Sequence, residues 1–266
     1  MNQPTNKFGI PDAIYRALCE DRYYAGPEVE LTASSLGGPP RIRQLFLEHS
    51  HEIVEDATDR FHLWQGKIVH EMLDRAGRGA IREKRFYFEV AGAKLSAAPD
   101  NLELRGRTLR EWKHTSVWSV VYGGRTEWEG QVNAQAEAVL QNGLEIDHPL
   151  EVWALLKDHS KDRALEALEK GKPETYPQAP IVYYPIRLWS REERHAWITS
   201  RIDLHRRAAL GDVADCTPEE RWERTPGDAK RCRLHCQVSK WCPQWAELQL
   251  RPKPEKAKRG RKAKAA

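Results

Sequence analysis

Apolar residues recur at helical spacing in several stretches of the chain. The spacing predicts a short helix over 11–20, a helix that opens near Arg41 and a helix over 127–141. A continuous apolar stripe predicts one long helix, with apolar positions at Ile53, Ala57, Phe61, Trp64, Ile68 and Met72. The segment Ser190-Arg-Glu-Glu193 has the form of a capping box and predicts a helix that reaches about Leu210.

Strand-like segments lie between these helices. Apolar and β-branched residues bounded by turn formers predict strands over 85–90, 94–104 and 108–113, and their short connections favour an antiparallel meander. Two further strands are predicted over 150–156 and 181–186, and Pro185 would either place the last of them at a sheet edge or lie at its end. This order of elements predicts a mixed α/β fold with a cysteine-bearing segment near the C-terminus.

Length and charge narrow the class of protein. A chain of 266 residues can bury a sizeable core without disulfides, and no apolar run reaches the roughly 18 residues of a membrane span. The first ten residues lack the pattern of a signal peptide, so we expect a cytoplasmic, intracellular protein. Lys and Arg number 43 against 39 Asp and Glu, and residues 251–266 contribute eight of the bases and a single acid. This tail would either contact phosphates without reading sequence or keep the chain soluble.

Three charged residues form the most informative motif. Residues two apart on a strand face the same side, so Glu111 and Lys113 project together. Gly106 lets the preceding strand fold back, which brings Asp100 beside Glu111. Two carboxylates at one point suit Mg²⁺ or Mn²⁺, which could activate water beside a stabilising lysine. The same residues also fit a solvated strand face with cross-strand ion pairs.

Polar residues on two of the predicted helices could complete such a site. Gly66 and His70 lie one helical turn apart, and the glycine is expected to clear space over an imidazole that would be a third metal ligand. Gln131 and Gln135 are also one turn apart, and a glutamine there could bond a phosphate or orient a catalytic group. The alternatives are a surface histidine and a solvated pair of amides.

Four of the five cysteines cluster near the C-terminus. They are Cys216, Cys232, Cys236 and Cys242. Clustered thiols in an intracellular chain suggest a metal site rather than disulfides, and four thiolates can hold zinc or a [4Fe–4S] cluster. We expect a structural clasp and not a redox centre. Cys19 stands far away on a predicted helix and is expected to be a core residue.

The order of these motifs resembles the PD-(D/E)XK nuclease superfamily, in its RecB-like and Cas4-like branch of phage-type exonucleases, over about residues 31–245. The resemblance rests on the G-x-x-x-H helix, Pro99-Asp100, Glu111-x-Lys113 and a following helix with glutamine. Segments 32–36 and 37–40 also resemble the opening of phage-type members. Two departures are Gln135 in place of the tyrosine of the Q-x-x-x-Y motif and the absence of a glycine ahead of Asp100.

The resemblance implies a restriction-endonuclease-like sheet flanked by helices, and it implies roles for individual residues. The metal ligands would be His70, Asp100, Glu111 and the backbone carbonyl of Trp112. Lys113 would be the catalytic lysine, and Gln131 would be the glutamine of the Q-x-x-x-Y motif.

A [4Fe–4S] cluster is also implied by the resemblance, held by one early cysteine and three late ones. Cys232, Cys236 and Cys242 resemble the late trio, and Cys216 could replace the early ligand, which is missing near Gly37. Cys19 could alternatively reach across, and this departure leaves structural zinc open.

The implied function is a metal-dependent DNA exonuclease that acts on DNA ends in recombination or repair, phage-encoded and working in an infected host cell, with a recombination protein as partner. One alternative is a non-catalytic DNA-binding or assembly factor that keeps the nuclease fold. Another is a zinc-stabilised interaction protein without a nucleic-acid role. The expected organisation is an N-terminal helix and loop (1–30), the nuclease core (31–212), the cysteine segment (213–248) and a basic disordered tail (249–266).

Overall fold

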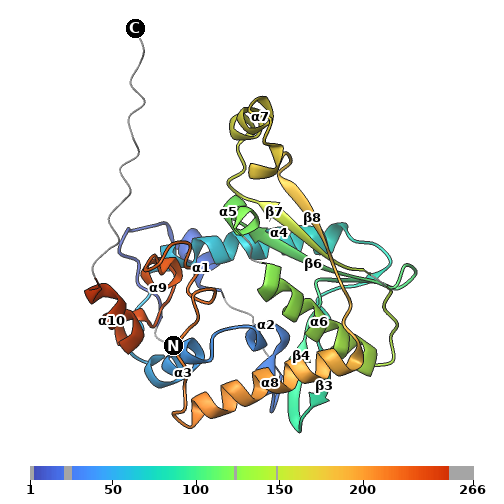
Figure 1. Cartoon of the computed structure of the whole chain (residues 1–266), viewed down its shortest axis with the longest axis horizontal. Helices are drawn as coiled ribbons and strands as arrows, with labels where there is room; N and C mark the ends of the chain where they lie inside the picture. The colour runs from blue at the N-terminus through green and yellow to red at the C-terminus, as the bar shows by residue number, and fades with distance from the viewer. Residues whose placement is uncertain (1–2, 21–25, 123–124, 148, 252–266) are drawn as a thin grey trace. The chain divides into compact units, whose positions relative to one another are not determined.

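The chain is an α/β protein whose mixed sheets are flanked by helices (Figure 1). The computed structural model describes residues 3–20, 26–122, 125–147 and 149–251. These residues divide into two compact units. Unit 1 contains 39–53 and 207–251, and unit 2 contains the described residues of 3–38 and 54–206. The sequence analysis expected boundaries at residues 30 and 212, and the two units divide after residues 38, 53 and 206. Of the expected basic tail, 249–266, only residues 249–251 are described.

Unit 2 contains two β-sheets. The three-stranded sheet has the order β1 (Leu31–Thr32), β4 (Ala93–Ala97) and β3 (Phe86–Val90). The five-stranded sheet has the order β2 (Ala80–Ile81), β5 (Asn101–Glu103), β6 (Thr108–Thr115), β7 (Leu150–Leu156) and β8 (Ile181–Ile186). Within the five-stranded sheet β6 and β7 pair in parallel, and the other neighbours pair antiparallel. β8 is therefore a strand at the edge of this sheet, and that prediction is confirmed.

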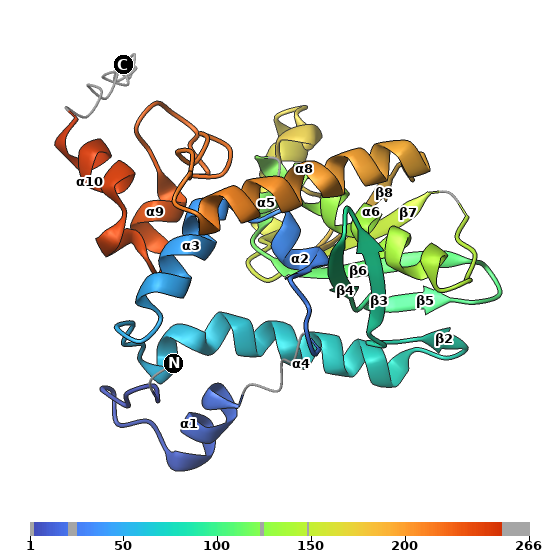
Figure 2. The same cartoon turned by 90° about the horizontal axis from the view of Figure 1, so that it is seen from below.

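The helices and 3₁₀ turns of unit 2 are α1 (Asp12–Cys19), α2 (Ala33–Leu36), η1 (Ala57–Arg60), α4 (Phe61–Ala76), α5 (Val117–Val121), α6 (Arg125–Gln141), α7 (Lys161–Glu169), η2 (Pro173–Thr175) and α8 (Arg191–Ala209), whose last turn enters unit 1. Figure 2 shows α4 on one side of unit 2 and α8 on the other, with strands between them. Unit 1 contains α3 (Pro40–His49), α9 (Lys230–Leu234), η3 (Ser239–Trp241) and α10 (Pro243–Leu250). Across the described ranges, no helix has the length and apolar content of a membrane span.

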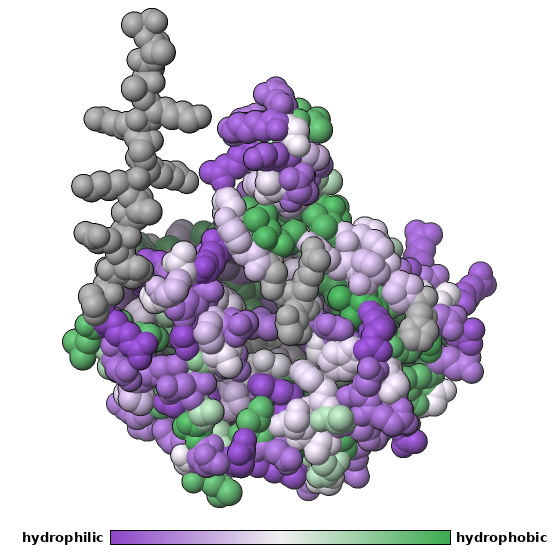
Figure 3. All heavy atoms as spheres, in the orientation of Figure 1, coloured by the Kyte–Doolittle hydropathy of each residue, from purple (hydrophilic) through white to green (hydrophobic). Residues whose placement is uncertain are grey.

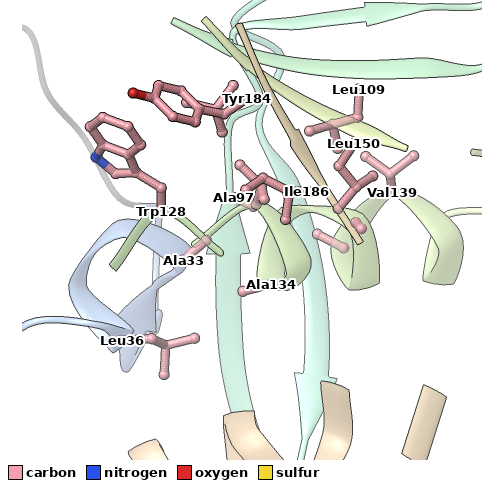
Figure 4. Packing of buried hydrophobic residues seen from close by; sticks show 14 of the residues in the cluster. Ala33, Leu36, Ala97, Leu109, Trp128, Ala134, Val139, Leu150, Tyr184 and Ile186 are labelled. Carbon is pink, nitrogen blue, oxygen red and sulfur yellow. The ribbon is translucent and has the colours of Figure 1, made fainter. Parts of the chain in front are cut away.

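Helix α6 lies in the core of unit 2. The apolar residues Val132, Ala136 and Val139 are fully buried. They belong to the same cluster as Leu109 of β6 and Leu150 of β7, and Figure 4 shows several members of this cluster together. Because α6 is held against the sheet by these contacts, the polar residues on the same helix have fixed positions relative to β6.

Unit 1 has a small core of its own. Leu45 of α3 is buried together with Val238 and Cys242 from the C-terminal segment. The rings of His49 and Trp241 stack with centroids 4.6 Å apart. These contacts join α3 to residues far along the chain, so the cysteine segment does not form its core alone.

The predicted long helix from Ile53 is wrong in its first part. Asp56 accepts a hydrogen bond from the backbone N–H of Thr58 and caps the turn η1, and α4 begins only at Phe61. Phe61 and Met72 are 44% and 65% exposed, so the apolar stripe does not form one buried face. In a continuous helix the N–H of Thr58 would bond to a backbone carbonyl one turn earlier. Here the Asp56 side chain accepts it instead, and this local bond outweighs the apolar periodicity.

The predicted strand over 94–104 is also wrong, because it is two strands in different sheets. It breaks at Ala98-Pro99, where proline has no N–H for a sheet ladder, into β4 and β5. Two antiparallel hairpins remain, β3 with β4 and β5 with β6, in place of one meander. The break is important for the site because Asp100 lies directly after it.

Helix α7 had no counterpart among the predicted elements. It projects from the ends of β7 and β8 (Figure 1), and its Leu165 and Leu168 are more than half exposed. In the view of Figure 3 the surface is mostly hydrophilic, and hydrophobic residues gather at the base of this projection.

Candidate functional site

Strand β6 presents the predicted glutamate and lysine on one side. Leu109 and Glu111 are buried, and Lys113 follows on the same side of the strand. Lys113 Nζ donates a hydrogen bond to Glu111 Oε1 at 2.7 Å. The carboxylate is 3% exposed, so the lysine partly compensates a charge that is buried in the protein. The predicted projection of the two side chains on the same side of the strand is confirmed.

Two glutamines of α6 complete the bonding of Glu111. Gln131 Nε2 donates to Glu111 Oε1 at 2.7 Å, while Gln131 Oε1 accepts from Lys113 Nζ at 2.7 Å. Gln135 Nε2 donates to Glu111 Oε2 at 2.8 Å. Gln135 is 3% exposed, and among the described residues its Oε1 has no hydrogen-bond partner. The alternative of a solvated amide pair is therefore wrong, and Gln131 and Gln135 both orient Glu111.

Asp100 lies beside this network. The pairing of Asn101 with Arg110 in the β5–β6 ladder sets the register that puts Asp100 across from Glu111. The backbone N–H of Trp112 donates to Asp100 Oδ2 at 2.6 Å. Burial and the nearby Glu111 carboxylate raise the pKa of Asp100, because both disfavour its charged form.

Helix α4 places His70 against Asp100. His70 Nδ1 lies 3.3 Å from Asp100 Oδ1. Hydrogen bonds with Asp100 and with Glu83 raise the pKa of His70, since two carboxylates favour the imidazolium. Neighbouring carboxylates contribute to both pKa shifts in this corner of the site, which is formed by His70, Asp100 and the residues next to them, and for Asp100 burial is the larger cause.

Glu83 is the residue of this corner that the sequence motifs did not identify. Its Oε1 lies 3.6 Å from His70 Nδ1, and one donor atom each of His70, Glu83 and Asp100 lie within 4.8 Å of one another. Glu83 follows β2, whose antiparallel pairing with β5 brings this segment next to Asp100. A two-residue strand gives almost no periodicity to detect, so only the tertiary pairing identifies the residue.

The proposed role of Gly66 is not supported by the structure. A Cβ atom built at Gly66 meets nothing within 4 Å. The glycine therefore does not clear space over His70, and the imidazole would fit equally well beside alanine.

The donor set of this corner suits a divalent cation. Imidazole nitrogen and carboxylate oxygens are ligands that Mn²⁺ accepts, and carboxylate oxygens suit Mg²⁺. A dication would also offset the crowding of carboxylates that raises the pKa of Asp100. Trp112 is held next to the corner through its backbone N–H.

Unit 1 brings the four clustered cysteines to one cavity. Cys216, Cys232, Cys236 and Cys242 all line it, together with Arg41, Arg221 and Arg231. Burial raises the pKa of Cys216 to about 12 and that of Cys232 to about 11, and neighbouring thiols add to both shifts. Cys19 belongs to unit 2, at the end of α1. The predicted grouping of these four thiols is what a shared metal or cluster would require.

Comparisons with known proteins bear on the fold alone. No family model matches the chain, and no curated protein matches it. Eight chains of solved structures match. One is the crystal structure of SSO0001, with a TM-score of 0.54 and 15% identity over 87% of this chain and 94% of that chain. Similarity at this level supports an α/β arrangement with mixed sheets and leaves function to be argued from the site.

Proposed function

We propose that the chain is a metal-dependent DNA exonuclease with a restriction-endonuclease-like fold of the PD-(D/E)XK type. The observation that carries the proposal is the convergence of Asp100, Glu111 and Lys113 at one point of the sheet, with His70 in contact with Asp100. A buried grouping of this kind costs stability, which a protein without chemistry to perform has no reason to retain.

The roles of the residues follow from their contacts. One or two Mg²⁺ or Mn²⁺ ions, held by Asp100, Glu111, His70 and the carbonyl of Trp112, would supply an activated water and polarise a phosphodiester. Lys113 would hold that water and stabilise charge that develops on the phosphate. Gln131 bonds to both Lys113 and Glu111, and its two hydrogen bonds hold these side chains in fixed positions relative to each other.

The cysteine cavity supports a second part of the proposal, a [4Fe–4S] cluster held by Cys216, Cys232, Cys236 and Cys242, with zinc as the alternative. Arg41, Arg221 and Arg231 line the same cavity, and their charge would offset the net negative charge of four bound thiolates. Either group would fasten the C-terminal segment to α3 within unit 1. Anaerobic purification separates the two, because a cluster gives a brown protein with iron and sulfide, whereas zinc gives a colourless one.

The proposed partners are DNA ends and a recombination or repair protein, inside a cell that a phage has infected. The test of activity uses labelled DNA and Mn²⁺. We expect Asp100→Ala and Lys113→Ala to abolish degradation, while Glu71→Gln, an exposed residue of α4, leaves it unchanged. If wild-type protein binds DNA and never degrades it under these conditions, the chain is a non-catalytic DNA-binding factor instead.

A further inference from the structure

Glu111 has little capacity left for a cation. A carboxylate offers about four acceptor positions. Lys113 and Gln131 take two positions on Oε1, and Gln135 takes one on Oε2. One position on Oε2 therefore remains, which is too few to dominate the binding of a dication.

Asp100 is also partly committed. Its Oδ2 accepts the backbone N–H of Trp112, so Oδ1, the oxygen next to His70, faces the corner. A hard cation takes six or more oxygen or nitrogen ligands, several of them water. A further anionic donor near His70 would therefore add much to the affinity.

Glu83 lies where that donor is needed. Its Oε1 is 3.6 Å from His70 Nδ1, and the donor atoms of Glu83, His70 and Asp100 lie within 4.8 Å of one another. Ligand atoms about 2.1 Å from one ion lie at most about 4.2 Å apart, and the distances of 3.6 Å from Glu83 Oε1 and 3.3 Å from Asp100 Oδ1 to His70 Nδ1 fall within that limit. The side chain is about half exposed, so it can adjust by the few tenths of an ångström that coordination requires.

The backbone of Glu83 is held by the segment that leads into Asp100, between β4 and β5. Its N–H donates to the carbonyl of Pro99, the residue before Asp100, at 3.2 Å. Its φ is +49°, a left-handed conformation that a glutamate adopts at a cost of about 1 kcal/mol. The bond to Pro99 keeps Glu83 in this conformation, and it ties the positions of the two carboxylates together.

We propose that Glu83 is a ligand of the divalent cation, together with His70 and Asp100, and that this three-donor corner favours Mn²⁺ over Mg²⁺. The preference follows from the imidazole, which suits Mn²⁺ better than it suits Mg²⁺. The proposal rests on the metal site of the proposed function and does not require that the chain cut DNA.

The test is Mn²⁺ binding to the full chain without DNA, measured by calorimetry and by the Mn²⁺ electron paramagnetic resonance spectrum. We expect Glu83→Gln, which is isosteric, to weaken the affinity for Mn²⁺ roughly tenfold or more and to alter the spectrum of bound Mn²⁺. Glu71→Gln on α4 is the matched control and should bind as wild type does. Wild-type protein should also bind Mg²⁺ more weakly than Mn²⁺, and equal affinities would overturn the preference.

The outcomes separate this proposal from the nuclease itself. If Glu83→Gln binds Mn²⁺ as tightly as wild type while Asp100→Asn does not, Glu83 is not a ligand, and DNA cleavage by wild type still supports the nuclease. If Mn²⁺ binding depends on Glu83 and wild type never cuts DNA, the ligand assignment stands and the nuclease fails. A wild-type chain that does not bind Mn²⁺ overturns both.

Discussion

The backbone N–H of Trp112 donates to Asp100 Oδ2 at 2.6 Å. Trp112 lies between Glu111 and Lys113 on β6, whereas Asp100 precedes β5, so this bond crosses between neighbouring strands. It leaves Asp100 Oδ1 directed at His70. Every residue other than proline supplies this main-chain N–H, so the position of Asp100 is largely independent of which of them occupies 112.

Removing the amide of Gln135 should reduce cleavage while the fold is retained. Gln135→Met fills the same space and deprives Glu111 Oε2 of its donor, so the carboxylate is no longer held in one orientation. We expect DNA degradation to fall about 10- to 100-fold. Gln249→Met on the exposed face of α10 is the control. Wild-type rates in Gln135→Met would show that this amide does not orient the glutamate.

Breaking the buried ion pair between α6 and α8 at one partner should destabilise unit 2. Arg194 Nε lies 2.7 Å from Glu137 Oε2, and the side chains are 7% and 2% exposed. Arg194→Met leaves a buried carboxylate with weaker compensation, and we expect the free energy of unfolding in urea to fall by about 3–5 kcal/mol. The double variant Arg194→Met, Glu137→Met should lose less than the single variant. A larger loss in the double variant would mean that the pair is stabilising as a unit.

Two helical glycines should respond to alanine in opposite directions. A Cβ at Gly130 would lie 2.3 Å from the Trp197 ring, so Gly130→Ala should cost about 1–3 kcal/mol of unfolding free energy. A Cβ at Gly66 meets nothing within 4 Å, so Gly66→Ala should add about 0.5–1 kcal/mol through helix propensity. Thermal unfolding of both variants measures this. Loss of stability in Gly66→Ala would reinstate a packing role for that glycine.

Acid should destabilise the protein partly through Asp56. The backbone N–H of Lys7 and the hydroxyl of Thr58 lower the pKa of the Asp56 carboxyl far below its usual range. A lowered pKa contributes stability that is complete above the pKa of the unfolded chain, about 3.9, and is lost as the pH falls toward the folded value. Unfolding free energies measured from neutral pH down to about pH 3 should therefore fall more steeply in wild type than in Asp56→Asn. Parallel curves would contradict this assignment.

The parts of the site that lie on long periodic elements could be predicted from the sequence. Glu111 and Lys113 share a face because strand geometry alternates, and Gln131 and Gln135 share one because of the helical turn. Gly106 correctly indicated that the chain folds back, and the resulting register sets Asp100 beside Glu111. These inferences needed only local geometry.

The errors arose where local bonding or tertiary pairing decided the outcome. Asp56 and Asp59 form a reciprocal cap that opens the turn η1, so no helix runs across them although the apolar spacing continues. Pro99 divides one predicted strand between two sheets. Glu83 depends on the pairing of a two-residue strand and on a left-handed backbone, neither of which leaves a periodic signal.

The two segments that build unit 1, residues 39–53 and 207–251, are separated in the chain by most of unit 2. During synthesis α3 therefore leaves the ribosome long before the residues that cover Leu45 have been translated. The four thiols receive their complete surroundings only after the residues up to Trp245, which line their cavity, have been translated. A metal or cluster can bind all four thiols only after that point, and a chain that stops before it would carry α3 with its apolar side uncovered, which favours aggregation.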